Sequence, residues 1–131
     1  MRRFDFAAVA AQVAPAQIVG DKLIDQMYAT APEDEMHIQK LLSANCFGDH
    51  YTRTGLEIKT RELLTFAMLI SLGGCEPQAK GHVAANLNVG NDRGVLISLV
   101  TQLLPFIGYP RTLNALRVID DVTSASSKKE S

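Results

Sequence analysis

Residues 61–82 read RELLTFAMLISLGGCEPQAKGH and predict two helices that meet at a pair of glycines. The first helix is expected over about residues 58–72. It is apolar on nearly every side, which is typical of a helix buried between neighbours or in a subunit interface. Gly73-Gly74 ends it, because glycine readily adopts the left-handed conformation found at many helix ends. Cys75 then stands at the N-cap or in the first turn of the next helix, which is expected to run to Val89.

The segments on either side of this stretch also follow the helical period, and no alternating run of β-branched residues indicates a strand. Pro15 suits the first turn of a helix that ends near Thr30, and Pro32 opens a second one. Asp92 is expected to cap a helix that Pro105 kinks or interrupts.

Gly108 to Pro110 is expected to form a turn, and a last helix is expected over residues 111–122. The sequence therefore predicts an all-α fold of about six helices in a single domain, residues 1–122. Residues 123–131 are too poor in apolar side chains to add to a core and are expected to form a mobile tail.

Composition excludes several classes of protein. The chain has 131 residues, 47% of them hydrophobic and 21% charged, which suits one folded domain with a real core. Its net charge of −1 gives no electrostatic reason to expect nucleic acid or an anionic membrane as a partner. Two cysteines are too few for a secreted disulfide scaffold, and no apolar run approaches the length of a membrane span. A cytoplasmic location is the expectation.

Cys75 and His82 are the first two candidates for chemistry. The positive end of a helix dipole favours a thiolate, so Cys75 could be reactive; it could equally be a small residue packed at a helix corner. His82 follows seven residues later, about 10 Å along a helix axis, which is too far for a direct hydrogen bond to Cys75. Gln78, one turn from His82, could connect them, or His82 could simply bond a backbone carbonyl.

Glu62 and Arg61 are candidates on the preceding helix. Glu62 shares a face with Phe66 and Leu69, and an acid buried there would suit proton transfer. Its simpler interpretation is an acid in the first turns that complements the helix dipole. Arg61 could bind a substrate carboxylate through two hydrogen bonds, or could be a solvated surface charge.

No metal site or cofactor site is predicted. The three histidines, His37, His50 and His82, share no spacing typical of metal ligands. No glycine-rich phosphate loop is present, and neither is the G-x-S-x-G pattern of a serine nucleophile.

Two longer stretches resemble a known family. They are FGDHYTRTGLEIKTRELLTFAMLISLGGCEPQAKGHVAANLNVG, residues 47–90, and IGYPRTLNALRVIDDV, residues 107–122. Together they resemble the carboxymuconolactone decarboxylase family, which lies within the alkylhydroperoxidase D-like superfamily. The resemblance implies an all-α, alkylhydroperoxidase D-like helical bundle that assembles as a homotrimer or homohexamer. It also implies a small-molecule substrate, no nucleic acid and no membrane partner.

The resemblance implies two different activities. Decarboxylases of the family convert 4-carboxymuconolactone to an enol-lactone and carbon dioxide without a cofactor. Thiol members use a C-x-x-C-x-x-x-H pattern with an acid on the preceding helix; Cys75, His82 and Glu62 match these positions. Gln78 occupies the place of the second cysteine, so no disulfide can form within the pattern, and only Cys46 remains as a possible resolving thiol.

Three hypotheses follow from these residues. The leading one is a cofactor-free decarboxylase of a small carboxylated lactone, in which His82 supplies a proton, Glu62 relays it and Arg61 anchors a carboxylate. The second is a thiol-dependent peroxidase or other oxidoreductase with Cys75 as a one-cysteine nucleophile. The third is a helical oligomer that binds a ligand without catalysis, because related folds host unrelated chemistry.

Overall fold

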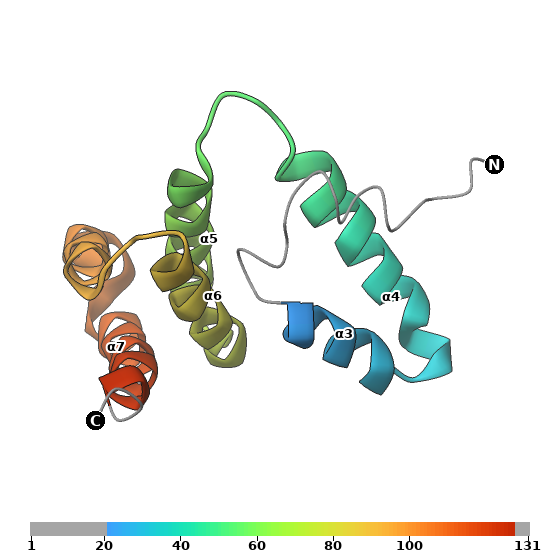
Figure 1. The fold of residues 1–131 in the computed structure, drawn as a ribbon. Helices are drawn as coiled ribbons and strands as arrows, with labels where there is room; N and C mark the ends of the chain where they lie inside the picture. The colour runs from blue at the N-terminus through green and yellow to red at the C-terminus, as the bar shows by residue number, and fades with distance from the viewer. Residues whose placement is uncertain (1–20, 128–131) are drawn as a thin grey trace. The chain divides into compact units, whose positions relative to one another are not determined.

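The computed structural model describes residues 21–127, and within that range every regular element is a helix (Figure 1). This confirms the prediction of an all-α fold. The chain divides by its internal contacts into two compact units, residues 1–57 and residues 58–131. A single domain over residues 1–122 and assembly into trimers or hexamers stay predictions.

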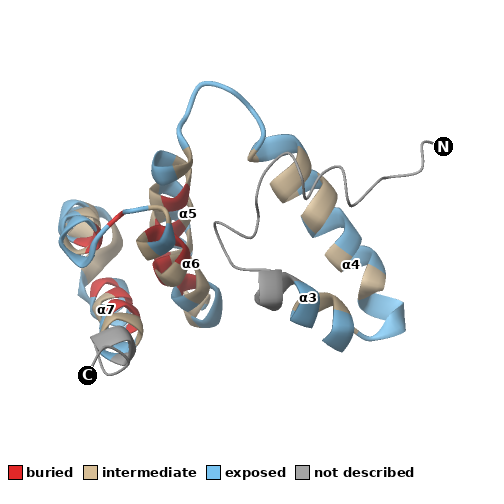
Figure 2. Cartoon of the chain, in the orientation of Figure 1, coloured by how far each residue is buried: buried red, intermediate tan, exposed pale blue. Residues whose placement is uncertain are grey.

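The described part of the first unit, residues 21–57, contains four short helical elements. They are α3 (Asp21–Thr30), the 3₁₀ helix η1 (Glu33–Glu35), α4 (Met36–Leu41) and the π-helix η2 (Leu42–His50). The predicted end at Thr30 is confirmed, whereas the predicted start at Pro15 lies outside the described residues. None of the side chains described in this unit, residues 25–57, is buried (Figure 2).

The second unit contains α5 (Ile58–Leu72), α6 (Glu76–Asn88) and α7 (Arg93–Ser127). α5 has the bounds that the sequence predicts. Gly73 and Gly74 follow it with φ angles of 75° and 71°, the left-handed conformation that glycine takes without steric cost. Cys75 is the N-cap of α6, as predicted, and a proline occupies its first turn.

α7 contains the two helices predicted here, which meet at a kink at Gly108. Asp92 caps its start, because the Asp92 Oδ1 atom accepts a hydrogen bond of 2.9 Å from the Val95 amide. Pro105 stays inside the helix, and the non-helical residue is Gly108, with φ 79° and ψ 170°. The prediction of a turn beginning at Gly108 is confirmed, because the turn needs a positive φ, which glycine supplies and proline cannot; Pro105 does not interrupt the helix. Gly108 therefore separates two limbs, residues 93–107 and 109–127, and the second ends five residues beyond Val122.

The core of the second unit lies where α5, α6 and both limbs of α7 face one another, as the buried segments in Figure 2 show. Its buried apolar residues are Phe66, Ile70, Ala79, Val83, Leu96, Val100, Ala115, Val118 and Ile119. Two exposed ion pairs tie the periphery: Lys80–Asp121 and Arg93–Asp120, each 2.6 Å. These helices hold the residues to which the sequence assigned chemistry.

The nearly all-apolar α5 is buried along one face only. Glu62, Phe66 and Ile70 form that face. On another face Leu64, Met68 and Leu72 are 46%, 62% and 69% exposed in the single chain. The sequence predicted burial between neighbours or in a subunit interface, and the described chain covers only the first of these two faces.

Candidate functional site

Glu62 and His82 form a buried pair between α5 and α6. The distance from Glu62 Oε2 to His82 Nδ1 is 2.8 Å. Glu62 shares its helix face with Phe66 and Ile70, and its side chain is 0% exposed; that of His82 is 25% exposed. A carboxylate removed from water needs a hydrogen-bonding partner, and α6 supplies it. The sequence-based choice for Glu62 between a buried acid and a helix-end charge is therefore decided in favour of burial.

The pair fixes which nitrogen of His82 is available. When Glu62 is ionised, its carboxylate can only accept hydrogen bonds, and Nδ1 then carries the proton that lies between the two side chains. No other residue in the described part of the chain bonds the Nε2 atom. A histidine held in this way can take up or release a proton at Nε2 while the acid stabilises its charged form. The arrangement is that of a general acid–base pair.

Two buried asparagines form hydrogen bonds at the main chain of the pair. The Asn86 side-chain amide donates to the backbone oxygens of Glu62, at 3.1 Å, and His82, at 2.7 Å. Asn91 donates to the Asn86 Oδ1 atom at 2.8 Å and to the Lys59 backbone oxygen at 2.9 Å. Asn86 and Asn91 are 0% and 4% exposed, so these bonds are shielded from water. The first turns of α5 and the C-terminal half of α6 are thereby joined by side-chain amides.

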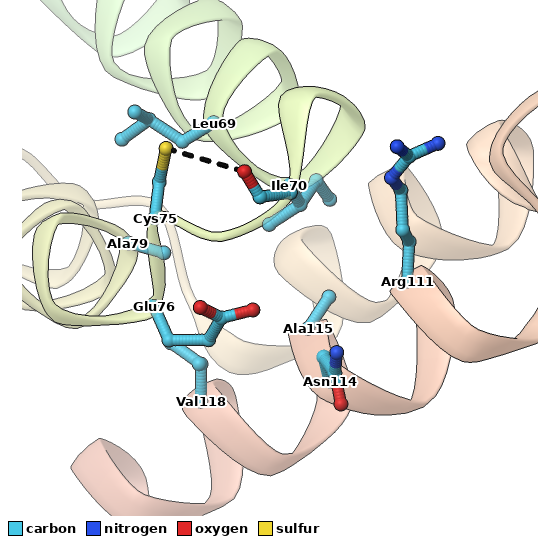
Figure 3. Close-up of a pocket in the computed structure, with 10 residues that line it drawn as sticks. Leu69, Ile70, Cys75, Glu76, Ala79, Arg111, Asn114, Ala115 and Val118 are labelled. Carbon is cyan, nitrogen blue, oxygen red and sulfur yellow. Dashed lines mark hydrogen bonds between the residues drawn. The ribbon is translucent and has the colours of Figure 1, made fainter.

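A hollow lies farther along the same pair of helices, next to Cys75 (Figure 3). It is a shallow hollow, whose empty volume is about 260 Å³ with the open solvent at its mouth included. The lining residues are Leu69, Ile70, Gly73, Cys75, Glu76, Ala79, Arg111, Asn114, Ala115 and Val118. Ala79 precedes His82 by three residues, about one helical turn, so the hollow ends close to the acid–base pair.

Cys75 lies in this hollow and outside the acid–base pair. Its Sγ atom is 3.5 Å from the Gly73 backbone oxygen, and it makes no hydrogen bond to Glu62 or His82 (Figure 3). Both cysteines are free thiols. Cys46 belongs to η2 of the first unit, so its proposed role as resolving thiol stays a prediction.

Three polar side chains of the hollow are unpaired. Within the described range, Arg111, Glu76 and Asn114 have no hydrogen bond or ion pair to other residues. Arg111 is close to the turn before α6: a Cβ atom built on Gly73 would lie 2.8 Å from Arg111 Nε. Figure 3 shows the Arg111 guanidinium and the Cys75 thiol on opposite sides of the hollow. These free groups are available to a ligand.

Arg61 and Gln78 are not brought into the site in the same way. Neither lines the hollow, and Gln78 is exposed. Sequence reasoning missed Asn86 and Arg111. The four-residue spacing from His82 to Asn86 places both on one helix face and could have drawn attention to Asn86. No signal in the sequence predicts that Arg111 lies next to Gly73.

The described residues contain no group of three or more histidine, cysteine, aspartate or glutamate side chains that could hold a metal ion. Among the helices between residues 21 and 127, none has the length and apolar character needed to cross a membrane.

Comparison with known proteins agrees with the resemblance seen in the sequence. Residues 37–121 match the carboxymuconolactone decarboxylase family. Over 106 residues the sequence is 26% identical to the 4-carboxymuconolactone decarboxylase of Acinetobacter baylyi, covering 81% of this chain and 78% of that protein. The family match includes all of α5 and α6, and therefore both members of the Glu62–His82 pair.

Proposed function

The chain belongs to the carboxymuconolactone decarboxylase family, and we propose that it decarboxylates a small carboxylated lactone without a cofactor. The observation that carries this proposal is the Glu62–His82 pair, buried at one side and one helical turn from a hollow that holds unpaired polar groups. The relative from Acinetobacter baylyi, a 4-carboxymuconolactone decarboxylase, makes 4-carboxymuconolactone the first substrate to test.

The reaction needs a place for electrons and a source of one proton. The bond between the substrate carbon and its carboxylate breaks, carbon dioxide leaves, and the electron pair remains on the carbon, delocalised toward a carbonyl oxygen. Protonated His82 then donates its Nε2 proton to that carbon, and Glu62 stabilises the charged ring until the proton leaves. Because the His82 side chain is partly exposed, solvent restores the proton for the next turnover.

Arg111 is the best-placed cation to hold a carboxylate that the substrate retains. The sequence suggested Arg61 for this role, but Arg111 lines the hollow and Arg61 does not. A guanidinium can bind a carboxylate through two parallel hydrogen bonds, which fixes the orientation of the substrate. Glu76 lies in the same hollow and disfavours a second anion beside it, so the retained carboxylate is expected on the Arg111 side.

The direct test is turnover of 4-carboxymuconolactone by the purified protein, followed as carbon dioxide release and enol-lactone formation. Wild-type protein is compared with His82→Asn, whose amide still donates to Glu62 but cannot deliver a proton from the Nε2 position. We expect turnover by the wild type and its loss in the variant. Absence of turnover on this and related carboxylated lactones would contradict the proposal.

A thiol-dependent oxidoreductase is the second candidate, and it is favoured by the position of Cys75. The thiol lines the hollow at the N-cap of α6, where a helix dipole supports a thiolate. In that reaction a hydroperoxide oxidises the thiolate to a sulfenic acid and is itself reduced to an alcohol. An external thiol then condenses with the sulfenic acid to a mixed disulfide and water, and a further thiol breaks that disulfide and releases the Cys75 thiolate. Rapid hydroperoxide reduction that Cys75→Ser abolishes, without lactone turnover, would favour this candidate.

The exposed apolar face of α5 supports a homo-oligomer, a trimer or hexamer. Leu64, Met68 and Leu72 expose large side chains at spacings that place them on one side of the helix. Light scattering coupled to size-exclusion chromatography measures the assembly. We expect Met68→Glu to reduce the mass to that of a smaller species, and an unchanged mass would exclude this face as the interface.

A further inference from the structure

We infer that Asn86 is a positioning residue, which sets the register of α6 against α5 so that His82 Nδ1 meets Glu62. This inference rests on the proposed function only for its catalytic consequence. The positioning itself is a statement about the ring of His82 and can be measured without any substrate.

The hydrogen bonds of Asn86 reach the main chain of both members of the pair. Its two amide hydrogens are used by the backbone oxygens of Glu62 and His82, which also serve their own helices. A carbonyl oxygen has two lone pairs and can accept both bonds. A single buried side chain therefore fixes the position of Glu62 along the axis of α5 relative to that of His82 along α6.

Asn91 fixes the orientation of the Asn86 amide. It donates to the Asn86 oxygen, so the amide nitrogen must point toward Glu62 and His82. Asn91 also holds the Lys59 backbone oxygen, one turn before Glu62 on the same helix. The backbone oxygens of Lys59 and Glu62, three residues apart on α5, therefore both accept hydrogen bonds from asparagine side chains. These two bonds oppose sliding of α5 along α6.

The general packing of the two helices does not require these bonds. Phe66, Ile70, Ala79 and Val83 already pack α5 against α6 in the core. Apolar contacts have little directional preference, whereas a hydrogen bond tolerates only small changes of distance and angle. The apolar residues hold the helices together, and Asn86 selects the register that brings Nδ1 to 2.8 Å from Glu62.

The test uses ¹⁵N-histidine labelling of the full chain and reads the tautomer of each ring by long-range ¹H–¹⁵N correlation. The chain has three histidines, so His37 and His50, both in the first unit, serve as internal references. Asn86→Asp keeps the shape and the oxygen that Asn91 bonds but removes both donors. Asn86→Leu removes them without adding a charge. Val83→Ala, a cavity variant in the same helix, is the matched control for loss of packing.

We expect His82 to lose its preference for the proton on Nδ1 in both Asn86 variants and to keep it in Val83→Ala. Unchanged His82 signals in the Asn86 variants would overturn the inference, and so would an equal change in Val83→Ala. It would also be overturned if neither Asn86 variant folds while Val83→Ala does, because Asn86 would then be needed for folding itself.

Activity adds a second readout if the lactone is turned over. A misplaced acid–base group should lower kcat by about 10²-fold in Asn86→Leu with little change in KM, because the hollow is untouched. If no lactone is turned over, the proposed function fails while the tautomer measurement still judges the role of Asn86.

Discussion

The two ends of the contact between α5 and α6 differ in whether their polar side chains are hydrogen-bonded within the chain. At the Glu62 end, a buried acid, a partly exposed imidazole and two buried asparagines are bonded to one another or to the main chain. At the Cys75 end, Arg111, Glu76 and Asn114 surround a hollow without bonding other described residues. A bonded, buried group is held for one chemical task, and an unbonded group at a hollow is free to bind. The difference indicates proton transfer at one end and ligand recognition at the other.

The largest effect is expected from breaking the acid–base pair. His82→Asn should lower kcat/KM for 4-carboxymuconolactone by about 10²–10⁴-fold, the usual contribution of a positioned proton donor. Glu62→Gln should cost less, because the imidazole remains and only the charge that stabilises its protonated form is lost. Steady-state assays of carbon dioxide release measure both values.

The control for this prediction is the fold of each variant. The substituted amide in either variant can still bond its partner across the α5–α6 contact, so far-ultraviolet circular dichroism and the melting temperature should stay near the wild-type values. A folded His82→Asn protein with wild-type turnover would show that the pair does not act in the reaction.

A smaller effect on catalysis is expected from removing the cation of the hollow. Arg111→Met should raise KM by about 10- to 100-fold with little change in kcat, since a hydrogen bond to a charged group contributes about 1.5–3 kcal/mol. Arg61→Met is the matched control, because Arg61 does not line the hollow. A larger rise in KM for Arg61→Met than for Arg111→Met would show that Arg61, as the sequence suggested, binds the substrate carboxylate.

The glycine pair allows backbone strain to be separated from contact with Arg111. Gly73 and Gly74 both have positive φ, so alanine at either position should lower the free energy of unfolding by about 1–2 kcal/mol. Only Gly73→Ala places a Cβ atom against Arg111; at Gly74 the same atom meets nothing within 4 Å. Denaturant unfolding should therefore give two similar stabilities, whereas KM should rise in Gly73→Ala alone. Equal KM values would mean that the position of Arg111 does not matter for binding.

The sequence predicted the helices of the second unit better than the site between them. The bounds of α5 and the start of α6 were predicted from local signals in the sequence. These signals are the apolar run, the glycine pair, and Cys75 followed by Pro77. The turn expected at Gly108 is present, because a positive φ favours glycine strongly, whereas Pro105, expected to kink or interrupt the helix, does not interrupt it.

Within the site, the sequence predicted which residues carry chemistry better than it predicted which of them come into contact. His82 and Glu62 were both predicted as candidates around one helix break, but their direct hydrogen bond was not predicted, because twenty residues and a turn separate them in the chain. Arg111 was missed because its approach to Gly73 depends on how α7 packs against the turn between α5 and α6, which no local pattern encodes. Gln78 was assigned by spacing, and in the folded chain it is exposed and does not line the hollow.

The smallest effect is expected at Cys75, and it separates the two candidate reactions. The thiol makes no hydrogen bond to Glu62 or His82, so decarboxylation should not need it, and Cys75→Ser should keep kcat/KM for the lactone within about twofold. Serine keeps the size and the weak bond to the Gly73 oxygen, so the hollow is preserved. The same protein should show no more hydroperoxide reduction than the wild type does. Loss of lactone turnover in Cys75→Ser, with the fold intact, would move the chemistry from the Glu62 end of the contact to the Cys75 end.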